Sequence, residues 1–409
     1  MSDSTEAAAR SLHTRVTVAL CFLAAMCEGF DVQAAGVAGP GLRAEFSPSD
    51  GWLALFFASS GAGLLLGAIA GGRIADRIGR KPVLVVSLAT FGLFALFTTL
   101  AGDMRALTAI RFMTGLGLGG AMPNLIALTA DVTASRMRNA GIALTFIGMP
   151  LGAVVSGLIA SAIPLDAWRV IFICGGIAPL VVAPLLIRFL PHGQFGSQAG
   201  ARAAPVLHNP LQELFGGGRA SITLLIWLGF LLIVLTLHLL LNWLPLLMMR
   251  KGLSGSFAGI SQAAFNVGGS LVTLSVGALL DSKWRRPAIA ASVVALPVIL
   301  VALAQAHGSA GPMIALVFFL GGAILAQQII LYAVASASFP AEIRGTVLGA
   351  AIAVGRVGSL IGPLFAGWLI ASGRSPAQVL TGLLPIVITC GLCVVLLGWR
   401  RSSAERTSA

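Results

Sequence analysis

Apolar residues fill most of this chain in long runs, which are separated by short polar segments rich in Arg, Lys, Gly and Pro. A run of roughly 20 apolar residues is the length that an α-helix needs to cross a bilayer. The pattern predicts twelve membrane-spanning helices, at 16–40, 52–72, 82–101, 104–130, 139–163, 167–190, 221–249, 257–280, 287–306, 312–337, 345–371 and 377–399. The count shifts by one if runs merge or split at a tight turn such as Gly102-Asp103.

The composition assigns these runs to a membrane. Hydrophobic residues make up 57% of the chain and charged residues 10%, with a mean hydropathy of +0.96. A soluble protein carries about 25% charged residues, and so much apolar surface exceeds what one globular core can bury. Residues 1–15 are polar, and the first run continues to about Pro40 without a small-residue cleavage pattern, so we expect no cleavable signal.

Basic residues gather on one side of the predicted helices. With both termini placed in the cytoplasm, 18 of the 26 Lys and Arg residues fall on inner segments, six on outer loops and two within spans. This bias is the positive-inside signature, and it accounts for the net charge of +12 without a nucleic-acid partner. The bias indicates a multi-pass membrane protein with both termini in the cytoplasm. We further expect a bacterial-type inner membrane and a monomer.

The chain divides into two related halves. Residues 191–220 form a polar, Gly-rich linker between an N-terminal half, 1–190, and a C-terminal half, 221–409. The inner loops 72–82 and 277–287 share Gly, Asp, Arg, a second base and Pro at an offset of 205. Both loops fall on the inner face, as a parallel repeat of two six-span halves requires.

The run Gly72-Arg-Ile-Ala-Asp76-Arg-Ile-Gly-Arg80-Lys81 resembles the inner-loop signature of the major facilitator superfamily. The resemblance implies an all-α integral membrane fold, with twelve transmembrane helices in two pseudo-symmetric six-helix halves. Asp76 stands where it can cap the neighbouring helix or pair with a base on it, and inner-face ion pairs that form in only one conformation act as a latch. The alternative is that these charges only orient the helices. The expected latch residues are Gly72, Asp76, Arg77, Gly79, Arg80, Lys81, Asp131 and Arg138.

Two acids, Glu28 and Asp31, lie deep inside the first run and three residues apart, so that they share one helix face. A carboxylate in hydrocarbon costs several kcal/mol unless it is paired, protonated or facing a water-filled cavity, which points to proton-coupled transport. By helical rise, Asp31 lies at a depth of about 13 Å and Arg111 at about 10 Å, so a contact between them is feasible. The alternatives are a purely structural pairing of the acids, and a packing role for Arg111 with its side chain reaching outward.

Arg356 lies eleven residues into the run 345–371, and no acid in the second-half runs neutralises it. An unpaired guanidinium in hydrocarbon is costly and its planar fork suits a carboxylate, so we expect a substrate anion as its partner. A first-half acid or interfacial water is the alternative. At the repeat offset of 206, Pro150 takes the place of Arg356, so the helices are duplicated and the charges are not.

Three stretches resemble the aromatic acid:proton symporters of that superfamily. They are Glu28-Gly-Phe-Asp31, Arg111-Phe-Met-Thr-Gly115 and Gly355-Arg356-Val-Gly358. Glu in place of the first Asp, with Leu241-Asn242-Trp243-Leu244-Pro245 in the seventh run, resembles the 3-(3-hydroxyphenyl)propionate transporter branch. The resemblance implies symport of a proton with an aromatic carboxylate.

Weaker candidates lie in the second half, and for each of them helix–helix hydrogen bonding or core packing is the alternative. The polar groups suited to a phenol or a carboxylate are Asn242, Gln327, Gln328 and Tyr332. His238 is titratable and suits a proton relay, and Trp243 suits stacking on an aromatic ring. The chain has no metal-ligand cluster, nucleophile triad or cofactor motif, so we expect a transporter driven by the proton gradient rather than an enzyme.

The sequence therefore predicts a proton-coupled symporter that imports a hydroxyphenylpropionate- or hydroxybenzoate-like carboxylate. Proton coupling is assigned to Glu28, Asp31 and Arg111, and substrate binding to Arg356, Asn242, Gln328 and Tyr332. A drug/proton efflux antiporter is the alternative, because the run Gly148-Met-Pro-Leu-Gly152 partly resembles the antiporter signature. Arg356 argues against it, since a buried cation repels cationic drugs.

Overall fold

Long α-helices occupy all twelve predicted spans in a computed structural model of the chain, and the described residues form no strand. The structure describes residues 2–133, 137–189, 214–216, 219–280, 282–340 and 343–407. Most of the predicted linker 191–220, and Asp281 of the second inner loop, lie outside these residues.

The helices follow one another as the apolar runs predict. The first six are α1 (Ser2–Phe46), α2 (Asp50–Ile78), α3 (Arg80–Thr98), α4 (Met104–Val132), α5 (Arg138–Ala162) and α6 (Arg169–Phe189), the last preceded by the 3₁₀ turn η1 (Leu165–Ala167). The others are α9 (Ala220–Arg250), α10 (Gly255–Leu280), α11 (Arg285–Gln305), α12 (Ala310–Ala337), α13 (Arg344–Ala371), α14 (Pro376–Gly382) and α15 (Leu384–Thr407). Within the described ranges, eleven segments are long and apolar enough to cross a membrane, and α10 is the twelfth long helix.

The tight turn at Gly102-Asp103 separates two helices, which settles the count of spans there. The Asp103 side chain accepts a hydrogen bond from the backbone N–H of Ala106 at 2.8 Å and so caps the start of α4. The predicted end of the first span near Pro40 is wrong, because α1 continues to Phe46. Membrane helices tolerate an internal proline where neighbouring groups satisfy the freed backbone carbonyl.

The first inner loop is also shorter than its sequence suggests. Helix α2 continues through Asp76 to Ile78, and Gly79 alone separates it from α3. Gly79 has a φ of 92°, in the left-handed region that glycine adopts without steric cost. The glycine of the signature therefore makes the chain reversal itself.

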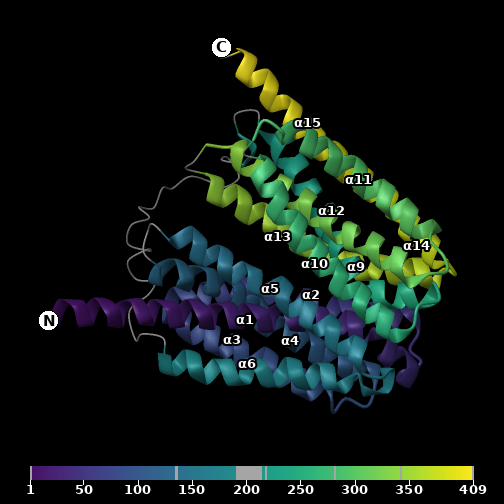
Figure 1. Cartoon of the computed structure of the whole chain (residues 1–409), viewed down its shortest axis with the longest axis horizontal. Coiled ribbons are helices and arrows are strands. Elements are labelled where there is room, and N and C mark those ends of the chain that lie inside the picture. The colour runs from purple at the N-terminus through teal and green to yellow at the C-terminus, as the bar shows by residue number, and fades with distance from the viewer. Residues whose placement is uncertain are drawn as a thin grey trace. The chain divides into compact units, whose positions relative to one another are not determined.

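The chain forms two compact units, Met1–Pro48 with Ser59–Pro205, and Ser49–Ala58 with Val206–Ala409. In the first unit α1 packs along α5, and α3 packs along α4; in the second α9 packs along α13, and α11 along α12 (Figure 1). The same neighbour relations thus recur in the two units. The first turns of α2 belong to the second unit, where Asp50 pairs with Arg250 at 3.3 Å.

Glycines bring the paired helices into backbone contact at equivalent places. A Cβ atom at Gly152 of α5 would overlap the carbonyl oxygen of Met26 in α1, and one at Gly358 of α13 would overlap that of Leu231 in α9. The two glycines are 206 residues apart, which is the offset of the sequence repeat. Small residues at such crossings let membrane helices approach closely and gain packing energy.

A second pair of glycines repeats this relation. Gly115 of α4 lies against the carbonyl oxygen of Ser60 in α2, and Gly321 of α12 lies against that of Phe265 in α10. These glycines are also 206 residues apart, so the repeat extends from the inner loops to the helix contacts.

Alanine at Gly321 should destabilise the protein, because its Cβ would overlap backbone that cannot move aside. We expect Gly321→Ala to lower the free energy of unfolding by about 1–3 kcal/mol. Gly311→Ala, in the first turn of the same helix with open space around it, should be neutral or stabilising by up to about 1 kcal/mol. Thermal unfolding of the two detergent-purified variants checks this, and equal stabilities would contradict the packing role of Gly321.

Candidate functional site

The two acids of the first span lie on α1, in the interior of the first unit. The side chains of Glu28 and Asp31 are 1% and 0% exposed. Gly29 lies between them in sequence and faces α5, where a Cβ atom would overlap the carbonyl oxygen of Met149. The glycine of the motif therefore lets α1 meet α5 backbone to backbone, and this contact orients the acids on either side of it.

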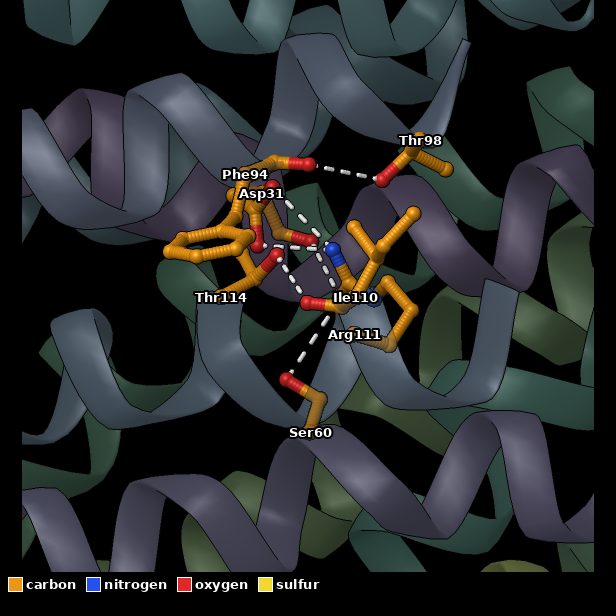
Figure 2. A network of polar contacts seen from close by, with 7 residues as sticks. All are labelled: Asp31, Ser60, Phe94, Thr98, Ile110, Arg111 and Thr114. Atoms are coloured by element: carbon orange, nitrogen blue, oxygen red, sulfur yellow. Dashed lines mark hydrogen bonds and ion pairs between the residues drawn. The ribbon is translucent and has the colours of Figure 1, made fainter. Parts of the chain in front are cut away.

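Asp31 forms an ion pair with Arg111 of α4 (Figure 2). Nη1 of Arg111 lies 3.0 Å from Oδ2 and 3.2 Å from Oδ1, and Nη2 donates to the backbone carbonyl of Asp31 at 3.3 Å. The contact between Asp31 and Arg111 is therefore present, as their similar depths in the two spans made feasible. The Arg111 side chain is 1% exposed, so the alternative in which it reaches outward is wrong.

Two further residues complete the surroundings of Arg111. Nη2 lies 3.5 Å from the hydroxyl oxygen of Ser60 in α2, and the guanidinium carbon lies 5.7 Å from the centre of the Phe172 ring in α6. Neither residue was predicted from the sequence. Ser60 had a weak signal, as a polar residue in an apolar run, whereas nothing distinguished Phe172 among 21 phenylalanines.

The stability of a buried ion pair depends on whether both of its partners are charged. Removing one partner leaves an uncompensated buried charge, which costs about 3–5 kcal/mol. Protonation of Asp31 has the same electrostatic consequence, because it removes the negative charge that balances Arg111.

Arg356 lies on α13 in the second unit and is half-buried. Gly355 beside it faces α9, where a Cβ atom would lie 3.2 Å from a methyl of Val234 and 3.6 Å from the carbonyl oxygen of Phe230. No acid among the described residues forms an ion pair with Arg356. His238 follows Val234 by one turn and so lies on the part of α9 that packs against α13.

The other predicted polar residues of the second unit lie on α12 and α9. Tyr332 and Gln328 of α12 are half-buried, and the Tyr332 ring meets the Phe230 ring edge to face at 4.8 Å. Asn242 is 6% exposed, and its amide donates to the backbone carbonyl of His238 at 2.7 Å. Asn242 is therefore held against its own helix.

Two weaker candidates have structural partners instead. The Gln327 amide donates to the backbone carbonyl of Ser292 in α11 at 3.1 Å, which links two helices. The buried Trp243 donates from its ring N–H to the carbonyl of Pro363 in α13 at 3.0 Å and packs against Phe57. Helix–helix bonding and core packing therefore describe these two residues.

The inner-face signature holds one ion pair among the expected latch residues that the structure describes. Arg80, at the start of α3, pairs with Asp131 at the end of α4, and both side chains are partly exposed. Lys81 donates to the backbone carbonyl of Ile187 in α6 at 2.9 Å. These contacts tie three helices of the first unit together at one end.

Asp76 does not play the expected part in these contacts. Gly79 is the cap residue of α3 and no side chain caps that helix, so the predicted capping by Asp76 is wrong. Asp76 and Arg77 are exposed on the last turn of α2, and among the described residues Asp76 has no ion pair. Arg138 is exposed on the first turn of α5, and Gly72 has open space around it.

The other end of the first unit carries a contact that the sequence did not predict. Glu45 forms a two-pronged ion pair with Arg169, with both N–O distances 2.6 Å, and also accepts from the Trp168 ring N–H at 2.7 Å. The three residues lie in regions that the sequence analysis treated as a loop or a span end, which carry no distinguishing pattern.

The described residues offer no metal centre. No three His, Cys, Asp or Glu side chains in the ranges given above lie together as a potential set of ligands.

The chain is similar over nearly its whole length to known transporters of aromatic acids. It is 38% identical over 392 residues to the 3-(3-hydroxy-phenyl)propionate transporter of Escherichia coli, covering 95% of each chain. It is 31% identical to the 4-hydroxybenzoate transporter PcaK of Pseudomonas aeruginosa, covering 93% of this chain and 92% of that one. These relatives are named as transporters, not as enzymes.

Solved structures share the fold. The D-xylose-proton symporter superposes with a TM-score of 0.75 at 18% identity, over 93% of this chain and 96% of that one. The nucleoside transporter NupG superposes with a TM-score of 0.71 at 14% identity, over 96% and 98%. The sequence itself matches the Major Facilitator Superfamily over residues 21–363. This chain, a multi-pass membrane protein, therefore belongs to the major facilitator superfamily, among the relatives that transport aromatic acids.

Proposed function

We propose that this protein imports an aromatic carboxylate together with a proton across a bacterial inner membrane, as a monomer with both termini in the cytoplasm. The main support for the proposal is Arg356. Its guanidinium is half-buried, and no carboxylate among the described residues forms an ion pair with it. A substrate carboxylate supplies the missing charge and accepts two parallel hydrogen bonds from the planar fork.

The relatives support an aromatic acid with a ring hydroxyl. Those most similar here are named for 3-(3-hydroxy-phenyl)propionate, 4-hydroxybenzoate and gallate. All three carry a carboxylate and at least one phenol. Tyr332 and Gln328 are the half-buried polar side chains of α12 that we assign to the substrate beside Arg356, with Asn242 as a further candidate.

The proton is assigned to the acids of α1. We infer that Asp31 is ionised while it pairs with Arg111, and that its protonation breaks this pair and marks the loaded state. Glu28 lies three residues earlier on the same helix and is equally buried, so it serves as the second acid of the pathway. Neither acid has a described counterpart at the repeat offset, where Val234 and Leu237 stand.

Coupling to a proton solves an electrostatic problem. An anion that enters an inside-negative cell works against about 2.3 kcal/mol per 100 mV. Entry of one proton with each monovalent anion cancels this charge, so the pH gradient alone drives uptake. The transporter fold then exposes the loaded sites to the two sides of the membrane in turn.

Counterflow in proteoliposomes tests the proposed substrate. Vesicles preloaded with unlabelled 3-(3-hydroxyphenyl)propionate should take up the labelled acid transiently, and vesicles preloaded with a lipophilic cation should not. Counterflow of the cation without counterflow of any aromatic acid would overturn the proposal in favour of drug efflux.

Neutralising Asp31 should uncouple transport. Asp31→Asn cannot cycle a proton, so we expect it to abolish accumulation driven by a pH gradient while substrate exchange at equal pH persists. Glu28→Gln should be less severe if Asp31 carries the proton. Asp166→Asn, a change at an exposed acid of η1, is the matched control and should behave as wild type. Normal gradient-driven uptake by Asp31→Asn would exclude this mechanism.

The fork of Arg356 should determine affinity for the acid. Arg356→Lys keeps the charge and loses the bidentate geometry, so binding should weaken by roughly 1.5–3 kcal/mol, or about 10- to 150-fold. Arg356→Ala should be worse for the acid and should matter much less for the uncharged amide of the same substrate. Arg374→Lys, at an exposed position, is the control. Equal losses for acid and amide would show that Arg356 is structural.

The ion pair of the inner-face signature should affect rate more than affinity. Asp131→Asn removes the pair with Arg80, which is partly exposed and so contributes up to about 1 kcal/mol. We expect slower substrate exchange by up to about 5-fold with an unchanged dissociation constant, and a smaller effect for Asp76→Asn. Lost equilibrium binding in Asp131→Asn would mean that the pair acts on the binding site instead.

A further inference from the structure

One titratable group on α9 has no part in the function proposed so far. His238 is half-buried and follows by one turn Val234, which packs against Gly355, the neighbour of Arg356 in sequence. Its ring nitrogen Nδ1 lies 3.1 Å from the backbone carbonyl oxygen of Val234, one turn earlier. A carbonyl oxygen only accepts hydrogen bonds, so Nδ1 carries the hydrogen.

This hydrogen bond fixes the character of the other ring nitrogen. In a neutral imidazole whose Nδ1 donates, Nε2 is a bare acceptor. A proton relay needs both nitrogens to exchange protons, and here one of them is held by the backbone of its own helix. His238 is thus better suited to accept a hydrogen bond than to pass protons on.

The face of α9 that carries His238 packs against α12 and α13, the helices that carry Tyr332 and Arg356. Phe230, Val234 and His238 follow at intervals of four residues and so share one face of the helix. Phe230 meets the ring of Tyr332 in α12, and both Phe230 and Val234 lie against Gly355 in α13. His238 continues this face by one turn.

The other polar groups nearby do not offer the same selectivity. Gln328 has a side-chain amide that presents either a donor or an acceptor, so it does not discriminate between ligands by hydrogen-bond character. Asn242 is almost fully buried and already donates to the backbone. Tyr332 has a hydroxyl that both donates and accepts. Of these four, His238 and Asn242 have an acceptor fixed by a backbone contact, and of these two only His238 is half-buried rather than almost fully buried.

We propose that His238 is a specificity-determining residue that accepts a hydrogen bond from the ring hydroxyl of the substrate, while Arg356 holds its carboxylate. This inference rests on the proposed function, because it assumes an aromatic carboxylate at Arg356. It selects hydroxylated aromatic acids over the same acids without the hydroxyl group. A site that leaves a hydrogen-bonding group unmatched rejects the analogue that lacks its partner.

Binding of three acids to the detergent-purified full-length protein tests the proposal by calorimetry. The ligands are 3-(3-hydroxyphenyl)propionate, 3-phenylpropionate and 3-(3-methoxyphenyl)propionate, which has the ring oxygen but no hydrogen to donate. The titrations are run at about pH 8, where an ordinary imidazole is neutral. Wild type should bind the hydroxylated acid about 2- to 12-fold more tightly than the other two, as one neutral hydrogen bond implies.

Three variants assign that preference to His238. His238→Phe keeps an aromatic ring without an acceptor and should bring the ratio to about one. His238→Gln retains an acceptor and should keep part of the preference, which guards against a general disturbance by the larger change. His307→Phe, at an exposed histidine after α11, should keep the wild-type ratio.

The outcomes separate this inference from the function on which it rests. If folded His238→Phe keeps the wild-type ratio of affinities for the hydroxylated and the other acids, the role of His238 is overturned. The same holds if the wild-type protein binds the acids without preferring the hydroxylated one. Both results are compatible with the proposed function. Loss of gradient-driven uptake in His238→Phe with an unchanged ratio would point to a relay and also overturn the role of His238. Wild-type protein that binds none of the acids would overturn the proposed function itself.

Discussion

The ion pair between Asp31 and Arg111 is the interaction on which the first unit depends. Both side chains are shut off from solvent, in a chain of which only 10% is charged. Two charges in such surroundings persist only while each compensates the other, because either alone is costly to bury. Loss of either charge would therefore weaken the contact between α1 and α4.

Glycine contacts make such charged sites possible. Gly29 places α1 directly on α5 beside the acids, Gly115 places α4 on α2 one turn after Arg111, and Gly355 places α13 on α9 beside Arg356. Each charged motif thus contains a glycine at which its helix packs closely against a neighbour. Of these glycines, Gly115 has a counterpart at the repeat offset, Gly321, whereas Leu235 and Met149 stand at the positions that correspond to Gly29 and Gly355.

Sequence reasoning was strong where one residue's chemistry or a long periodic signal decides the outcome. Apolar run lengths gave the twelve helices, and similar depths in spans 1 and 4 indicated the contact of Asp31 with Arg111. It failed where the outcome depends on how helices rotate and continue. The helix through Pro40, the exposed place of Asp76 and the ring of Phe172 above Arg111 all follow from packing that no local pattern records. The assignment of Ser49–Ala58 to the second unit is of the same kind, because α2 is one unbroken apolar run in sequence.

The proposed mechanism requires that Asp31 changes its protonation state when the transporter binds its aromatic acid. Infrared difference spectra between substrate-free and substrate-saturated protein report this directly, since a protonated carboxyl group has a carbonyl stretch that a carboxylate lacks. We expect a substrate-dependent carboxyl band in the wild-type protein and no such band in the Asp31→Asn protein. A spectrum without such a band, or an identical band in both proteins, would contradict the mechanism.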